Sequence, residues 1–225
     1  MNRFFPLIAL SVITAGLFTG CASSGSSKET SSVARAGMPP LPAGVTLTKD
    51  KQLQGVWLKP GFNFSGKPSL TIEPTVYKAV ERPNEAPMRA FAVKELRSEE
   101  AKEARETGLF SGVFAEDNGT APTNAPALRL VNTIYQYEKG GGGARYFAGF
   151  AGGGQPVIRV RGEMFDNNND LVFVYDAKRS GEKVSARLAG VFESDEEIQR
   201  ADIHDLAIDL ADYMMTAAGL TPPKR

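Results

Sequence analysis

Apolar residues near the end of the chain recur at spacings of three and four. They form one stripe, which consists of Ile203, Leu206, Ala207, Leu210, Tyr213, Met214 and Ala217. This period predicts an amphipathic helix, which we place at residues 195–218. Ser194 and Glu197 have the spacing of a capping box at its start, and Gly219 ahead of two prolines predicts its end.

A weaker stripe predicts an earlier helix at residues 87–107. Its apolar members are Met88, Phe91, Ala92, Leu96, Ala101 and Ala104. Pro87 lies in the first turn and Gly108 follows the last one, as is typical of helix starts and ends. Because charged residues fill most of the other positions, we expect this helix to lie on the surface of a sheet.

Residues 157–165 alternate between apolar and polar, which predicts a strand with one buried side. The residues expected to face the core are Ile158, Val160 and Met164, and those expected to face water are Arg159, Arg161 and Glu163. The run DNNND at residues 166–170 predicts a turn, because Asn and Asp tolerate left-handed backbone and bond to their own main chain. Residues 171–177 would return as the partner strand.

Other segments have the β-branched and aromatic content of strands. These segments are residues 55–59, 69–77 and 127–137, and residues 109–114 are either a short strand or a buried turn. All these elements together predict an α+β domain. We expect a mainly antiparallel sheet with two principal helices packed on one face.

The start of the chain has a different pattern. One basic residue, Arg3, precedes an apolar run from Phe4 to about Phe18, and small residues follow. This pattern is typical of a secretory signal peptide, which we place at residues 1–20. The run is shorter than the roughly 20 residues that a membrane-spanning helix needs.

Residues 18–21, Phe-Thr-Gly-Cys, resemble a bacterial lipobox, with Phe18 where Leu is commonest. The resemblance implies diacylglycerol on the sulfur of Cys21, cleavage after Gly20 and acylation of the new N-terminus. The alternative is an ordinary secretory peptide with an incidental cysteine, although Cys21 is the only cysteine of the chain. Two or more acyl chains anchor a protein stably to a membrane. By the same resemblance, Ala22 in place of Asp favours the cell outer membrane, with the domain on its periplasmic face.

These patterns divide the chain into four parts. Residues 1–20 are the signal peptide, and residues 21–50, rich in Ser, Gly and Pro, are the lipidated cysteine and a flexible tether. Residues 51–219 are a single periplasmic α+β domain, and residues 220–225 are a tail. With 26 basic and 26 acidic residues, the chain has no general attraction to nucleic acid, and we expect no nucleic-acid partner.

Candidate catalytic residues are few. The turn at residues 166–170 is not followed by the Gly and Glu that a calcium loop needs. His204 is the only histidine and Cys21 would be acylated, so we expect neither a zinc site nor a thiol nucleophile, and we expect His204 to be a solvated helix residue. No G-x-S-x-G motif presents a catalytic serine. We therefore expect no catalytic residue, no metal and no cofactor, while paired carboxylates leave open a carboxylate-dependent envelope hydrolase.

The stretch GGGGARYFAGFAGGG at residues 140–154 connects two predicted strands. It lacks the Lys and Ser or Thr of a P-loop and the following helix of a dinucleotide site. Its small residues have the spacing that lets backbones approach closely in lipid, which leaves open an interfacial segment or a membrane-contacting hairpin of a ring-forming secretion or transport lipoprotein. Long loops of this kind are often functional. The residues that we expect to form a contact surface are Arg145, Tyr146, Phe147 and Phe150.

The lipobox, the Ser-rich tether, the segments TGLFSGV, LRLVNTIYQYEKG and ARYFAGFAGGG, and the final helix together resemble uncharacterised bacterial lipoproteins with domain of unknown function 4410. The matching residues of the glycine-rich element are Gly140, Arg145, Tyr146, Gly149 and Gly153. The resemblance covers most of residues 50–218 and implies an envelope location without known catalytic residues. We therefore predict a non-enzymatic, lipid-anchored accessory or assembly module that contacts an unknown envelope protein or a second copy of itself.

Overall fold

The computed structural model describes residues 38–82, 85–115, 127–140, 156–181 and 194–224, and the statements below concern these residues. They form a mixed sheet of eight strands and two long helices. The strands are β1 (Thr48–Asp50), β2 (Gln54–Leu58), β3 (Ser69–Ile72), β4 (Val76–Tyr77), β5 (Gly112–Phe114), β6 (Ala127–Glu138), β7 (Val157–Phe165) and β8 (Leu171–Arg179). The helices are α1 (Ala86–Glu106) and α4 (Asp195–Ala217).

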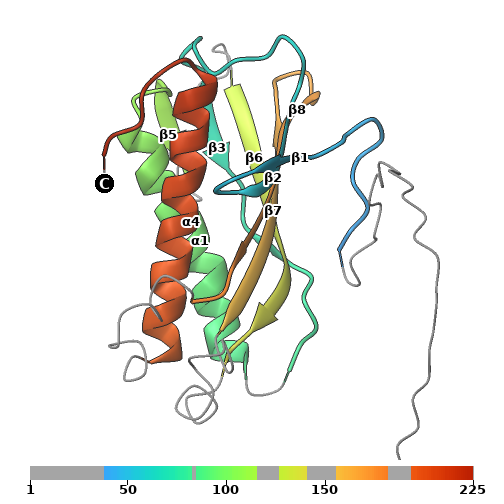
Figure 1. The fold of residues 1–225 in the computed structure, drawn as a ribbon, viewed down its shortest axis with the longest axis vertical. Helices are drawn as coiled ribbons and strands as arrows, with labels where there is room; N and C mark the ends of the chain where they lie inside the picture. The colour runs from blue at the N-terminus through green and yellow to red at the C-terminus, as the bar shows by residue number, and fades with distance from the viewer. Residues whose placement is uncertain (1–37, 83–84, 116–126, 141–155, 182–193, 225) are drawn as a thin grey trace, which may run out of the picture. The chain divides into compact units, whose positions relative to one another are not determined.

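The strand order across the sheet is β1-β2-β8-β7-β6-β3-β5, and β4 also pairs with β6. The pairings from β1 across to β6 are antiparallel, whereas those made by β3 and β4 are parallel. Both helices lie side by side on one face of this sheet (Figure 1). The structure thus confirms the α+β class, the mainly antiparallel sheet and the two helices on one face.

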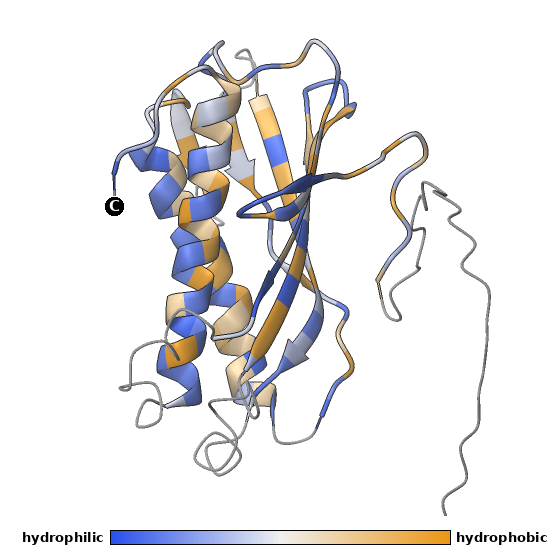
Figure 2. Cartoon of the chain, in the orientation of Figure 1, coloured by the Kyte–Doolittle hydropathy of each residue, from blue (hydrophilic) through white to orange (hydrophobic). Residues whose placement is uncertain are grey.

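The hydrophobic core lies between the helices and the sheet. Fully buried side chains come from both layers, among them Leu96, Leu206, Ile134, Val160 and Phe173. Each helix carries hydrophilic and hydrophobic residues along its length (Figure 2), as expected of a helix that covers a sheet. Each such apolar side chain stabilises the fold by about 1.5–3 kcal/mol when it leaves water, so the two layers hold each other in place.

Both ends of α4 are where the sequence predicts them. Ser194 Oγ accepts from the backbone N–H of Glu197 at 3.2 Å, and the backbone N–H of Ser194 donates to Glu197 Oε2 at 2.8 Å. This reciprocal pair is a capping box. At the other end Gly219 has a φ of +77°, and the N–H of Leu220 donates to the carbonyl of Met215 at 2.9 Å, as in a Schellman motif.

The polar run after β7 forms the predicted turn of a hairpin. Asp166 Oδ1 accepts from the backbone N–H groups of Asn168 and Asp170 at 2.9 and 3.0 Å. Asn169 has a φ of +62°, a left-handed conformation that Asn tolerates better than most residues. The turn therefore joins β7 to β8 as antiparallel partners.

The segment at residues 69–77 is two strands and not the single strand expected. β3 and β4 both pair in parallel with β6, but Pro74 lies between them, and proline has no N–H to donate to a sheet. The neighbouring residue Glu73 still donates its N–H to the carbonyl of Leu130 in β6, at 2.9 Å. In residues 109–114 the short-strand alternative holds, because they include β5.

Arg161 in β7 is buried, and the expectation that its side of the strand faces water was wrong there. Its Nε and Nη2 donate to the two carboxylate oxygens of Asp176 at 2.8 and 3.1 Å, and only 3% of its surface is exposed. Its Nη1 donates to the carbonyl of Pro39 at 2.6 Å. The chain ahead of β1 therefore covers part of the sheet face opposite the helices (Figure 1), and β1 itself starts before residue 51, where the sequence places the domain boundary.

Candidate functional site

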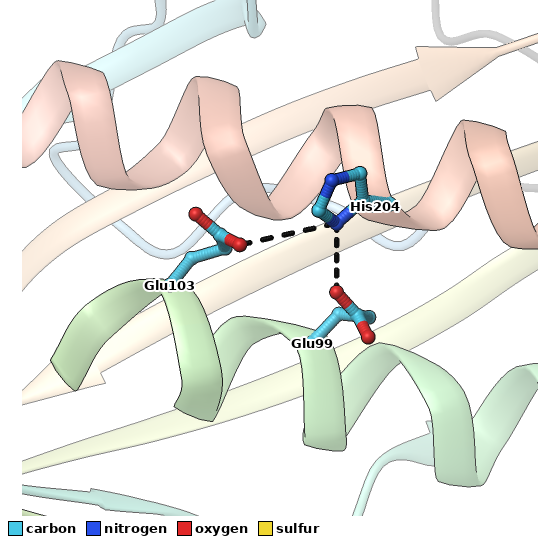
Figure 3. A group of neighbouring side chains, drawn as sticks. All are labelled: Glu99, Glu103 and His204. Carbon is cyan, nitrogen blue, oxygen red and sulfur yellow. Dashed lines mark hydrogen bonds and ion pairs between the residues drawn. The ribbon is translucent and has the colours of Figure 1, made fainter. Parts of the chain in front are cut away.

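The only histidine of the chain lies against two carboxylates of the neighbouring helix. His204 on α4 places its Nδ1 at 2.7 Å from Glu99 Oε2 and at 3.9 Å from Glu103 Oε1, both on α1 (Figure 3). Glu99 and Glu103 are four residues apart, a spacing that puts two side chains on one face of a helix. One ligand atom from each of the three side chains lies within 4.8 Å of the other two. We call these three residues the interhelix cluster.

Lys102 balances part of the negative charge of this cluster. Its Nζ lies 3.2 Å from Glu103 Oε1 and 3.5 Å from Glu99 Oε2. The hydrogen bond to Glu103 raises the pKa of Lys102, so its ammonium form is favoured. The lysine side chain is 51% exposed, and it can therefore leave the carboxylates for water without crossing the core.

Burial changes steeply across the interhelix cluster. The side chain of Glu103 is 2% exposed, that of Glu99 is 19% exposed, and that of His204 is 40% exposed. A buried carboxylate is costly unless it is paired or coordinates a metal, whereas the imidazole side of the cluster is open to solvent. The cluster thus has a closed end at Glu103 and an accessible end at His204.

His204 differs from its expectation in one respect. It is partly exposed, as a residue on the polar flank of the helix would be, but its Nδ1 also lies within hydrogen-bond distance of Glu99 Oε2. The exclusion of a zinc site counted only histidine and cysteine ligands, and carboxylates also bind zinc. Nothing in the sequence reveals that Glu99 and His204 meet, because they are 105 residues apart.

A second polar cluster is enclosed between α1 and the sheet. The hydroxyl oxygen of Tyr175 lies 2.7 Å from Glu100 Oε1 and 2.9 Å from Asn132 Oδ1, and Asn132 Nδ2 donates to Glu100 Oε2 at 2.5 Å. We call Glu100, Asn132 and Tyr175 the core triad. All three are almost completely buried.

A count of hydrogens shows which protonation state completes the core triad. The three side chains make three mutual contacts, and the tyrosine hydroxyl and the Asn132 amide supply one hydrogen each. A protonated Glu100 supplies the third by donating to the hydroxyl of Tyr175, which then donates to Asn132. With Glu100 ionised, one contact would join two oxygens without a hydrogen. Burial, only partly offset by these hydrogen bonds, raises the pKa of Glu100 to about 7, in keeping with that count.

Gly162 makes room for the core triad. It lies directly between Asn132 of β6 and Tyr175 of β8 in the sheet register. A Cβ atom at Gly162 would lie 2.0 Å from Cε1 of Tyr175, so the tyrosine ring occupies the space of the missing side chain. The absence of a side chain at this one position lets the hydroxyl of Tyr175 reach both Asn132 and Glu100.

A shallow hollow of about 220 Å³ lies at the end of β6. The titratable groups that line it are Arg82, Tyr135, Tyr137, Glu138 and Arg159. A carboxylate-dependent hydrolase needs two facing carboxyl groups, and this hollow has one carboxylate and two guanidinium groups. The described lining of this hollow therefore does not supply such a pair of carboxyl groups.

The predicted lipidation site and contact surface fall outside the described residues. These positions are Gly20, Cys21, Arg145, Tyr146, Phe147 and Phe150. Within the described ranges, no helix is both long and apolar enough to cross a membrane. The anchor and the contact surface therefore stay predictions.

Comparisons with known proteins give no family for this chain. No family model matches it and no curated protein matches it. Among solved structures it is similar to a PelC dodecamer from Paraburkholderia phytofirmans, with 16% identity, 67% of this chain and 94% of that chain covered, and a TM-score of 0.41. A dodecamer of a PelC variant from the same organism gives 16% identity, 69% and 94% coverage and a TM-score of 0.42. This likeness is too low to assign a function, and the resemblance to lipoproteins with domain of unknown function 4410 stays a prediction.

Proposed function

We propose that this protein is a lipid-anchored cell-envelope protein that acts at the outer membrane as a non-enzymatic accessory or assembly module. The observation that carries this proposal is the N-terminal sequence, where an apolar run ends in Phe-Thr-Gly-Cys and Cys21 is the only cysteine of the chain. The thiol would then carry diacylglycerol, and two or more acyl chains hold a protein stably on a membrane.

The first described residues of the chain are fixed on the sheet of the domain. Arg161 binds the carbonyls of Pro39 and Pro40 at 2.6 and 3.2 Å, on the sheet face that the helices leave free. The stretch of chain from Cys21 to Pro39 can span at most about 60 Å. A tether of this length would keep the domain within reach of partners near the membrane.

The anchor is tested by labelling cells with a radioactive fatty acid and fractionating their membranes. The intact protein should take up label and sediment with the outer membrane, because its acyl chains insert there. The Cys21→Ser variant should take up no label and appear in the soluble fraction, and Ser23→Ala, two residues away, should behave as the intact protein does. Membrane association that is unchanged in Cys21→Ser would contradict the anchor.

The interaction role is tested separately by site-specific photocrosslinking in intact cells. A photoreactive residue at Tyr146 or Phe150 should give adducts of defined higher mass, because these positions belong to the predicted contact surface. The same residue at Leu220, an exposed position in the tail, serves as the control. Recovery of monomer alone at both test positions would count against a module that binds a partner or itself through this surface.

A further inference from the structure

Side chains from two helices bring a nitrogen and two carboxylate oxygens to one point at the edge of the helical layer. We propose that the interhelix cluster, Glu99, Glu103 and His204, binds one divalent transition-metal ion, of which Zn²⁺ fits best. This site is independent of the proposed lipid anchor, because every residue in it belongs to α1 or α4. It would fix α4 to α1 one turn away from Arg200, which forms an ion pair with Glu95 and lies over the ring of Phe91.

The distances suit a tetrahedral ion after small movements. Zinc binds histidine nitrogen and carboxylate oxygen at roughly 2.0–2.2 Å, which places ligand atoms of a tetrahedron about 3.4 Å apart. His204 Nδ1 is 2.7 Å from Glu99 Oε2 and 3.9 Å from Glu103 Oε1. The two ligand pairs that include His204 therefore have to change their separation by less than about 1 Å. The carboxylate oxygens of Glu99 and Glu103 lie within 4.8 Å of each other, so they have to approach by at most about 1.4 Å. The rotatable bonds of the glutamate side chains allow such a change without moving either helix.

The type of ligand selects the class of ion. Imidazole nitrogen suits zinc and neighbouring transition metals, while calcium and magnesium prefer an all-oxygen shell with more ligands. Two carboxylates neutralise the charge of a divalent ion. Three protein ligands leave the fourth position of a tetrahedron for water, and the exposed side of His204 provides the entry path.

In the metal-free protein the ammonium group of Lys102 lies where the proposed metal ion would bind. Its ammonium group contacts both carboxylates of the interhelix cluster, and an incoming metal ion must displace it. Because half of the lysine side chain is already in water, the displacement costs little packing. Lys102 should therefore act as a competitor of the metal, so that its removal strengthens binding.

The test is zinc titration of the purified full-length protein, without an affinity tag and in detergent, by isothermal calorimetry. The expected result is one ion per chain, together with a higher melting temperature in the presence of zinc. Loss of even a hydrogen bond to a metal ligand lowers metal affinity by about 10–100-fold. We therefore expect His204→Ala and Glu99→Gln to weaken binding by about 100-fold or more, whereas Lys102→Met should strengthen it.

Glu95→Gln is the matched control. Glu95 lies one turn before Glu99 on α1 and faces a cationic group of α4, Arg200, at 3.7 Å, but it is not part of the interhelix cluster. It should leave the zinc affinity unchanged. Circular dichroism of each metal-free variant confirms that it folds. Absence of stoichiometric binding by the intact protein, or equal binding by intact protein, His204→Ala and Glu99→Gln, would overturn the proposal.

Discussion

Two consecutive carboxylates on α1 lie in opposite environments. Glu100 faces the sheet, is fully enclosed and contacts two neutral side chains, Tyr175 and Asn132. Glu99 faces α4 and contacts His204 and Lys102, both of which reach water. One residue along a helix is a rotation of about 100°, and this rotation carries a carboxyl group from the core to a solvent-accessible edge.

The difference shows that partners and solvent decide the role of a carboxyl group. In the core triad the partners supply too few hydrogens for an ionised Glu100, so the neutral acid is favoured and serves the fold. In the interhelix cluster the two carboxylates face the imidazole of His204 and the ammonium group of Lys102. In the proposed site a metal ion would displace the ammonium group and bind the imidazole and both carboxylates. The core triad should therefore dominate stability, and the interhelix cluster should dominate ligand binding.

The largest effect is expected from Gly162→Ala. The new Cβ would overlap the ring of Tyr175 and push its hydroxyl away from Glu100 and Asn132. We expect a loss of about 3 kcal/mol in the free energy of unfolding, measured by urea denaturation of the non-lipidated Cys21→Ser chain. Gly66→Ala is the control, because its Cβ meets no atom within 4 Å. Equal stability of the two variants would show that the tyrosine ring is not held over Gly162.

Glu100→Gln should remove a pH dependence of stability. The folded-state pKa of Glu100 is raised to about 7 from its usual value of 4.5, so its contribution is fully present below about pH 4.5 and is lost as the pH rises to about 7. The loss amounts to the order of 3 kcal/mol. The amide introduced by this substitution supplies the third hydrogen of the triad at every pH. The variant should match the parent chain near pH 4.5 and exceed it at pH 8, measured by denaturation across this range.

Glu99→Gln is the matched control for that experiment, since it changes the neighbouring carboxylate outside the core triad. It should leave the difference in stability between pH 4.5 and pH 8 largely in place. A Glu100→Gln chain with the same pH profile as the parent would contradict the enclosed, protonated Glu100.

Tyr175→Phe should have a smaller effect. It deletes the hydroxyl that joins Glu100 to Asn132 and leaves buried polar atoms without that partner, which costs about 1–3 kcal/mol. Urea denaturation at pH 5, where Glu100 is protonated, measures this loss. The substitution keeps the aromatic ring over Gly162, so the loss reports on the hydroxyl and not on the packing of the ring. Unchanged stability would mean that the hydroxyl contributes nothing to the triad.

The smallest effect on stability is expected from His204→Ala without metal. The contact with Glu99 involves a side chain that is 40% exposed, and even a fully charged exposed pair contributes only about 0–1 kcal/mol. Thermal unfolding of the metal-free variant should therefore resemble that of the parent chain. A large loss would make His204 a structural residue and weaken its assignment as a ligand.

The elements of this fold were largely predictable from local pattern. The stripe from Ile203 to Ala217, the capping pair Ser194 and Glu197, and the turn at residues 166–170 each depend on neighbours within a few positions, and the structure confirms them. The alternation of apolar and polar residues gave a wrong prediction where a segment distant in the sequence covers a strand. Arg161 alternates like a solvent-facing residue, yet the backbone of residues 39–40 and Asp176 enclose it.

Both polar clusters depend on contacts that sequence distance hides. Glu100 meets Asn132 and Tyr175 across 32 and 75 residues, and each of the three is an ordinary residue in its own segment. The signal that was available is the spacing of Glu99 and Glu103, which places both on one helix face. It could not point to His204, because the pairing of α1 with α4 follows from packing on the sheet and not from either helix alone.

The contrast between the two consecutive carboxylates is tested most directly by zinc titration of Glu99→Gln and Glu100→Gln side by side. Both variants make the same chemical change, one residue apart on the same helix. The account predicts that Glu99→Gln loses zinc binding while Glu100→Gln binds as the parent chain does. Equal loss in both variants, or binding retained in both, would contradict the separate roles of the interhelix cluster and the core triad.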